Sequence, residues 1–181
     1  MAKAGYPDGK GFPELQYDCP STTTERQMAE YLQQQLAQIG IKMNIQQFSW
    51  SQFNERMRDR KSQMFGYAWA ADYPDAENFL QLLYGPNKAP GNNTSNYENK
   101  EYDKLYEQAS KLPPGPERTA LYKKMRDIFV EDSPWIPMVN RFRYQLYHSW
   151  VKNFKPELTV ANYFKYIRVD TNAKKDLKAK L

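Results

Sequence analysis

The sequence is poor in the residues that most often carry covalent chemistry. It has one cysteine, Cys19, and one histidine, His148, among 181 residues. A single cysteine excludes an internal disulfide and a metal cluster built on several cysteines. His148 is the sole imidazole that could act as a base, and no Gly-x-Ser-x-Gly motif offers a nucleophile. Nucleophilic catalysis is therefore poorly supported, and a hydrolase using Asp72 or His148 is a minor alternative.

Long apolar runs are also missing. No stretch approaches the roughly 18 apolar residues that a membrane-spanning helix needs, and no basic-then-apolar signal segment opens the chain. Aromatic residues, in contrast, make up 15% of the sequence and apolar residues 40%, which is typical of a globular chain rather than a disordered one. We expect one domain, or one large lobe of a longer protein, with a buried core.

The charge is only slightly unbalanced. The chain has 26 basic and 21 acidic residues, a formal net charge of +5, and much of the excess lies in the tail 171–181. A tail of this composition is usually solvated, so we expect it to be loose. A basic domain that binds nucleic acid or anionic lipid is only a weak alternative, and no nucleic-acid partner is predicted.

Apolar spacing along the first half of the chain switches between the strand period and the helix period. Alternation predicts strands at 15–18 and 41–46, and an apolar run predicts a third at 64–70. Helical spacing predicts helices at about 23–39 and after Ser49. Capping-box patterns mark both helix starts, Thr22 with Glu25 and Ser49 with Gln52. This alternation predicts an α/β fold, whose first β-α-β unit is most simply parallel.

The second half of the chain is predicted to be mostly helix and loop. A short helix follows Pro74, and a loop from Gly85 to Asn99 is long enough to be functional or mobile. A helical hairpin is expected on either side of 113–116. Three further strands are predicted at 134–140, 143–147 and 163–169.

The most informative stretch is the apolar segment from Met64 to Ala70, which ends on a carboxylate and a turn. A strand that delivers Trp69 and Asp72 to its carboxyl end is how an α/β domain presents a binding site. Asp72 is either a turn residue that bonds the backbone before Pro74 or a desolvated anion that awaits a cation. Trp69 is either a core anchor or the wall of a cleft.

Other candidate sites are weaker. Asp72, Asp75 and Glu77 are close in sequence but lack the spacing and the central glycine of a calcium loop, so no metal is predicted. Asp75 is better explained as a helix cap. No dinucleotide or other cofactor is expected, because the only Gly-x-Gly pattern precedes the first strand and lacks a third glycine. Trp50 recurs with Phe53 at helical spacing, which favours a core stripe.

Several ordered stretches together resemble a known family. They are residues 4–9, 36–42 leading to Trp50, 69–75 with 78–80, 96–105, 118–122 and 131–137. In this order and spacing they resemble the solute-binding proteins of peptide ABC transporters, that is, extracellular solute-binding family 5 of the dipeptide- and oligopeptide-binding type. The resemblance runs from Ala4 to about Val169.

Such proteins have two lobes joined by a hinge, and ligand binds between the lobes as they close. The resemblance implies that residues 1–170 are the C-terminal lobe, a single lobe of a periplasmic-binding-protein type II fold with a mixed sheet flanked by helices. It implies that the N-terminal lobe, with its signal peptide, is absent from this chain. It also implies a periplasmic or extracytoplasmic location, delivery of a peptide to an ABC transporter permease, and no enzymatic activity.

The resemblance also assigns roles to residues. In the oligopeptide-binding members, an aspartate of the Trp-x-x-Asp-Tyr segment holds the α-ammonium group of the ligand, and the match falls on Asp72. A peptide amine with a pKa of about 7.7–8.0 is largely protonated at neutral pH, so enclosing it requires an anion. The tryptophan of the same segment maps to Trp69, as a wall of a side-chain pocket, and Trp50 is carried over from the tryptophan that precedes it in the oligopeptide binder.

The opposite end of the ligand is left open by the resemblance. The arginines that receive the peptide carboxylate fall on Met57 and Gly66, although Arg56 and Arg58 flank the first, and a ligand-facing histidine falls near Thr24. Family members also carry nickel complexes, haem or sugars, so a non-peptide solute is an alternative. The predicted ligand-binding residues are Asp72, Trp69, Trp50, Ala68, Ala70, Tyr67, Arg56 and Arg58.

Overall fold

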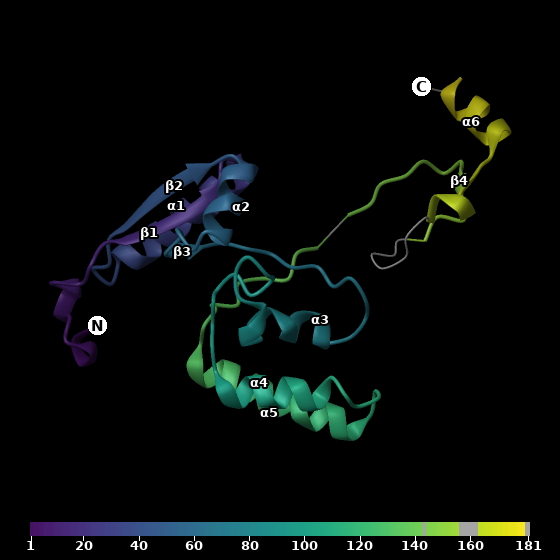
Figure 1. The fold of residues 1–181 in the computed structure, drawn as a ribbon. Helices are drawn as coiled ribbons and strands as arrows, with labels where there is room; N and C mark the ends of the chain where they lie inside the picture. The colour runs from purple at the N-terminus through teal and green to yellow at the C-terminus, as the bar shows by residue number, and fades with distance from the viewer. Residues whose placement is uncertain (143, 156–162, 180–181) are drawn as a thin grey trace. The chain divides into compact units, whose positions relative to one another are not determined.

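The computed structural model describes residues 1–142, 144–155 and 163–179 (Figure 1). The chain divides into two units. Unit 1 comprises Met1–Trp69 and Phe79–Pro134. Unit 2 comprises Ala70–Asn78 and Trp135–Leu181. The candidate ligand-binding residues are distributed over both units.

Unit 1 begins with a parallel three-stranded sheet, in the order β2-β1-β3. The strands are β1 (Leu15–Pro20), β2 (Met43–Phe48) and β3 (Met64–Phe65). β1 pairs with β2 over six residues and with β3 over two. The predicted parallel β-α-β unit is confirmed.

The third strand is much shorter than the predicted 64–70. Only Met64 and Phe65 pair with β1, opposite Tyr17 and Asp18. Two residues disfavour further pairing between β3 and β1. Gly66 has no side chain to pack in a strand, and Pro20 of β1 has no N–H to donate. The chain therefore leaves the edge of the sheet at Gly66.

The two helices of the β-α-β units begin where the capping patterns predicted. Helix α1 (Thr23–Ala37) starts at the N-cap Thr22, whose hydroxyl accepts a hydrogen bond from the Glu25 N–H at 3.3 Å. Helix α2 (Trp50–Arg58) has a complete capping box of Ser49 and Gln52. The core on one face of the sheet is formed by Tyr17, Cys19, Ala29 and Met43, with Leu15, Leu32, Leu36, Ile45 and Met64 packed against it.

Helix α2 buries one face, but not the whole predicted stripe. Phe53 and Met57 are buried, whereas Trp50, in the first turn, is 59% exposed. Because a residue at the first helical position projects beyond the end of the helix, Trp50 escapes the core that Phe53 enters. The expectation that Trp50 belongs to a core stripe is wrong.

The remainder of unit 1 contains the predicted helical hairpin and the predicted loop 85–99. Helix α4 (Lys100–Ala109) and helix α5 (Pro116–Asp132) form a hairpin, with Tyr102 and Met125 completely buried. The short helix α3 (Glu77–Leu80) spans the junction of the two units, and the Tyr102 hydroxyl donates a hydrogen bond to the Leu80 carbonyl at 2.8 Å.

The loop 85–99 is held together by one buried side chain. Asn93 is fully buried, and its amide donates hydrogen bonds to the carbonyl oxygens of Tyr84 (3.1 Å) and Tyr97 (2.9 Å). Its side-chain oxygen accepts from the Ser95 hydroxyl at 2.9 Å and from the Tyr97 N–H at 3.3 Å. Both donors and the acceptor oxygen of the Asn93 side chain are therefore used within this loop and its flanking residues. This makes Asn93 the centre of an ordered structure.

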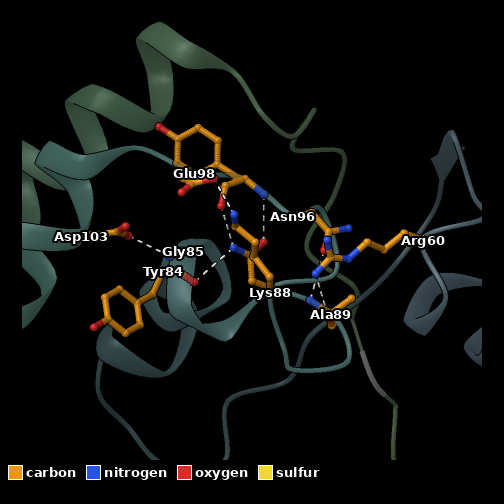
Figure 2. A network of polar contacts seen from close by, with 10 residues as sticks. Arg60, Tyr84, Gly85, Lys88, Ala89, Asn96, Glu98 and Asp103 are labelled. Atoms are coloured by element: carbon orange, nitrogen blue, oxygen red, sulfur yellow. Dashed lines mark hydrogen bonds and ion pairs between the residues drawn. The ribbon is translucent and has the colours of Figure 1, made fainter.

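A second set of contacts joins the loop to the end of α2 (Figure 2). Arg60 donates a hydrogen bond to the Ala89 carbonyl at 2.9 Å, and the Ala89 N–H donates to the Asn96 side chain at 3.1 Å. Lys88 forms an ion pair with Glu98. The loop is therefore built into unit 1 by side chains from both of its ends.

Unit 2 contains less regular structure than predicted. Strands β4 (Val151–Lys152) and β5 (Arg168–Val169) pair antiparallel, and β5 is a short remnant of the predicted strand 163–169. The described residues of 134–147 form no strand. Their apolar side chains are not buried, and Phe142 and Leu146 are 90% and 98% exposed. An apolar-polar alternation specifies a strand only where a partner strand satisfies its backbone. Arg143, in the predicted strand 143–147, lies outside the described residues.

The basic tail begins with a helix, which the sequence did not predict. Helix α6 (Thr171–Lys178) is capped by Asp170, which accepts a hydrogen bond from the Ala173 N–H at 3.0 Å. The side chain of an N-cap aspartate stabilises the first turn of a helix. In the part of the chain that the structure describes, no helix is both long enough and apolar enough to cross a membrane.

Candidate functional site

The predicted binding segment leaves the sheet after β3 and continues across the junction of the units. Tyr67 and Ala68 are exposed and Trp69 is half-buried, all in unit 1. Ala70 and Asp72, both exposed, belong to unit 2. Trp69 is therefore neither a fully buried core anchor nor a free surface residue.

Asp72 is held by the side chain of Asn78, which is itself buried. The Asp72 N–H donates to the Asn78 side-chain oxygen at 3.2 Å, and the Asn78 amide donates to Oδ2 of Asp72 at 3.4 Å. Oδ1 of Asp72 accepts no hydrogen bond from the residues that the structure describes. The Asp72 side chain is thus bonded to the Asn78 side chain rather than to the backbone before Pro74, and its second oxygen stays open among the described residues.

The neighbouring carboxylates are used inside the same turn. Asp75 accepts a hydrogen bond from the Glu77 N–H at 2.9 Å, which confirms its predicted capping role. The Tyr73 hydroxyl bonds to the Glu77 carboxylate, and this bond raises the pKa of Tyr73 above its usual value. Within the described residues, no group of three or more histidine, cysteine or carboxylate side chains could hold a metal ion.

Trp50 stands at the exposed start of α2, beside the buried ring of Phe53. Its ring centroid is 5.9 Å from that of Phe53, which in turn meets Phe65 of β3 edge-on at 6.3 Å. The aromatic chain from Trp50 to Phe65 ends at the residue that precedes Gly66. It therefore connects an exposed aromatic face of α2 to the start of the binding segment.

The two arginines predicted to face ligand have different surroundings. Nε of Arg56 donates to Oδ2 of Asp18 at 2.8 Å, and Nη2 donates to the Lys61 carbonyl at 3.1 Å. The guanidinium carbon of Arg56 also lies 4.4 Å from the centre of the Phe48 ring. Arg56 is thus engaged within unit 1, whereas Arg58 is exposed and has no partner among the described residues.

Asp18 is a residue whose importance the sequence did not reveal. It is 1% exposed, and its Oδ2 accepts hydrogen bonds from Arg56 and from the Ser62 hydroxyl, the latter at 2.7 Å. Oδ1 is buried and receives no hydrogen bond from any described residue. A polar residue that alternates with apolar neighbours usually faces solvent, and Asp18 has that pattern. Only its place on a central strand could have signalled burial, because both faces of such a strand are covered.

The two positions matched to carboxylate-receiving arginines are closed by packing. Met57 is 3% exposed. A Cβ atom on Gly66 would lie 2.4 Å from the Tyr17 hydroxyl oxygen. Burial also raises the pKa of Tyr17 to about 12, so this hydroxyl stays neutral at physiological pH. Neither position can take a long cationic side chain without rearrangement of the core.

Comparison with known proteins identifies the family. The model of bacterial extracellular solute-binding proteins, family 5 Middle, matches residues 1–91, which is half of the chain. The chain belongs to this family. The resemblance seen in the sequence is confirmed, and family 5 proteins are solute-binding proteins rather than enzymes.

Individual relatives in family 5 differ in what they are named for. The chain is 30% identical over 157 residues to Di/tripeptide-binding protein 3 of Pseudomonas aeruginosa, covering 86% of this chain and 30% of that protein. It is 30% identical over 142 residues to Heme-binding protein A of Haemophilus influenzae, covering 77% of this chain and 26% of that protein. The chain therefore spans less than a third of the length of these relatives.

A solved structure supports the fold as well. The chain is similar to the ABC transporter-associated periplasmic binding protein DppA of Helicobacter pylori, in complex with the peptide STSA. The TM-score is 0.79 at 28% identity, and the match covers 93% of this chain and 33% of that one. The predicted α/β fold of the periplasmic-binding-protein type II class is confirmed.

Proposed function

We propose that this chain supplies one lobe of a peptide-binding protein, which captures a di- or oligopeptide between two lobes and delivers it to an ABC transporter permease outside the cytoplasmic membrane. Residues 1–170 would form the C-terminal lobe, and the other lobe would supply the opposing wall. No cofactor or metal is required by this function.

The open carboxylate of Asp72 is the observation that carries the proposal. Asn78 fixes one carboxylate oxygen, while the other accepts no hydrogen bond from the described residues. A carboxylate that is oriented but not neutralised suits a cationic amine, because charge-assisted hydrogen bonds are the strong ones. A solute without a cationic amine, such as haem, would gain nothing from it.

The other predicted residues are proposed as further ligand contacts. Trp69 and Trp50 would provide aromatic surface for its side chains, and the backbone of 67–70 would pair with its peptide groups, a mode that accepts many sequences. Arg58 is exposed and could meet the far end of the ligand. Arg56 is excluded from the proposed set, because Asp18, Lys61 and Phe48 occupy its guanidinium.

The test is calorimetry, in which the two-lobe protein is titrated with a dipeptide or a tetrapeptide. Asp72→Asn keeps the shape and the contact with Asn78 but removes the charge, and it should weaken binding at least about tenfold. The matched control is Asp59→Asn, which removes an exposed carboxylate paired with Lys61 and should leave affinity unchanged.

The ligand side of the same test uses the N-acetylated peptide. This ligand has no cationic amine, so it should bind the unchanged protein weakly, and Asp72→Asn should weaken it no further. Equal affinity of the two proteins for the free-amine peptide would refute the role of Asp72. Because the proposed site needs a second wall, the 181-residue chain alone should bind the peptide more weakly than the two-lobe protein.

A further inference from the structure

We propose that Asp18 is a positioning residue for the segment 67–69, and that it acts by holding β3 and the end of α2 rather than by touching ligand. Asp18, Arg56 and Ser62 are together called the Asp18 cluster. This inference rests on the proposed function, which assigns segment 67–69 to the peptide.

The segment needs such a restraint because its own strand is very short. β3 has two residues, and the chain departs from the sheet immediately afterwards at Gly66. A ladder of this length restrains the strand poorly, and a slip of one residue would reverse the faces of every side chain that follows. Trp69 is only four residues beyond Phe65.

Three consecutive residues before β3 are held by the Asp18 cluster and by its strand. The Lys61 carbonyl accepts from Arg56 at 3.1 Å, and the Ser62 hydroxyl donates to Asp18 at 2.7 Å. The side-chain oxygen of Gln63 accepts from the Gln16 N–H of β1 at 2.7 Å. The connection between α2 and β3 is therefore bonded to α2 at Lys61 and to β1 at Ser62 and Gln63, up to the start of the ladder.

The charge of Asp18 makes this arrangement specific. A buried carboxylate is costly unless an opposite charge and hydrogen bonds compensate it. Arg56 supplies the charge, and both Arg56 and the Ser62 hydroxyl donate hydrogen bonds to Oδ2 of Asp18. The pair cannot be formed if α2 or the connection shifts, since donor and acceptor would separate. A buried ion pair is weak evidence of added stability, and its best-attested use is to specify one register over others.

The alternative is that Arg56 itself binds ligand and that Asp18 merely orients it. The two explanations differ in a double-mutant cycle on peptide affinity. If Arg56 acts only through Asp18, then Asp18→Asn, Arg56→Gln and the double variant should all weaken binding to a similar extent, about tenfold. If Arg56 contacts ligand directly, its loss should weaken binding further in the Asp18→Asn background.

The experiment uses the gene product in its natural length, with calorimetric affinity for one dipeptide and hydrogen exchange of the backbone N–H groups of 64–67. Ser62→Ala, a milder variant that removes one donor and no charge, should weaken binding about threefold. Exchange at 64–67 should become faster in all of these variants. Met125→Ala is the control, because it empties part of the buried helical hairpin and should lower stability without changing affinity.

Two results would overturn the inference: unchanged affinity of Asp18→Asn in a protein that binds peptide, or a double variant weakened by the product of the two single effects. A natural-length protein that binds no peptide would instead refute the proposed function. Hydrogen exchange at 64–67 distinguishes the cases, because unchanged exchange in Asp18→Asn would refute the hold on β3 whether or not peptide binds.

Discussion

The buried amide of Asn78 binds Asp72 at two points, accepting from its backbone N–H at 3.2 Å and donating to its carboxylate at 3.4 Å. This neutral partner orients the charge of Asp72 without neutralising it. Asp18, in contrast, has a charged partner, because Nε of Arg56 lies 2.8 Å from its Oδ2. The chain thus pairs the Asp18 carboxylate with a cation inside the fold, whereas the Asp72 carboxylate, for which we propose a ligand amine, is held by a neutral amide.

The first prediction concerns that orientation. Asn78→Ala removes both hydrogen bonds, so the Asp72 carboxylate should move among several directions, and peptide affinity should fall about three- to tenfold. The free energy of unfolding should also fall by about 1–2 kcal/mol, because a buried polar partner is lost. Calorimetry and urea denaturation measure the two effects. Unchanged affinity would mean that Asp72 is oriented without Asn78.

The second prediction concerns the close approach of Tyr17 to Gly66. A Cβ on residue 66 would lie 2.4 Å from the Tyr17 hydroxyl oxygen, and the next nearest atom, Cζ of the same ring, would be 3.6 Å away. Gly66→Ala should therefore lower the free energy of unfolding by about 1–3 kcal/mol. In a Tyr17→Phe background the same substitution should cost much less, since the offending atom is gone. Equal costs in the two backgrounds would contradict this account.

The third prediction is a loss of stability at alkaline pH. Burial raises the pKa of Tyr17 to about 12, against about 10 in an unfolded chain. A group whose pKa is raised by folding stabilises fully below its unfolded pKa and loses that effect as pH rises through the folded value. Unfolding free energy should therefore fall between about pH 10 and 12, the share of Tyr17 being about 2 kcal/mol.

Tyr17→Phe isolates that share. The Tyr17 hydroxyl forms no hydrogen bond within the described residues, so the substitution should change stability little at pH 7. Between pH 10 and 12 the variant should lose less stability than the unchanged protein, as measured by urea denaturation at each pH. Parallel loss in both proteins would show that Tyr17 ionises without hindrance in the folded state.

The fourth prediction tests the loop 85–99. Asn93→Ala removes four hydrogen bonds from a fully buried position and should lower the free energy of unfolding by about 2–3 kcal/mol. The neighbouring Asn92 is exposed and makes a single contact with the Gln81 side chain at 3.4 Å. Asn92→Ala is therefore the matched control, and its stability should change by less than about 0.5 kcal/mol. Similar losses at both positions would refute the central role of Asn93.

Local patterns predicted the first half of the fold well. Periodicity and capping residues are read within one helix or strand, so α1, α2, β1 and β2 were expected close to their observed bounds. The strand predicted at 64–70 failed after Phe65, because the length of a ladder depends also on the strand beside it, and Pro20 lies there. Both predicted strands within 134–147 failed for lack of a paired neighbour among the described residues.

The candidate site could be predicted only as a stretch of sequence. Trp69 and Asp72 were singled out by the apolar segment and by the resemblance to family 5, and their role in binding stays a prediction. The engagement of Arg56 could not, because its partner Asp18 is 38 residues away and carries the alternation of a surface residue. The role of Asn78 was hidden as well, since an asparagine in a helix start gives no signal of burial.

The completely buried Cys19 turns the scarcity of cysteine into a practical advantage. It lies on the central strand of the parallel sheet, and burial raises the pKa of its thiol, so the reactive thiolate is suppressed. A thiol-specific reagent can modify this chain at Cys19 only, and only after β1 separates from its neighbours. The rate of Cys19 labelling in dilute denaturant therefore measures how often unit 1 opens. This measurement needs no engineered cysteine.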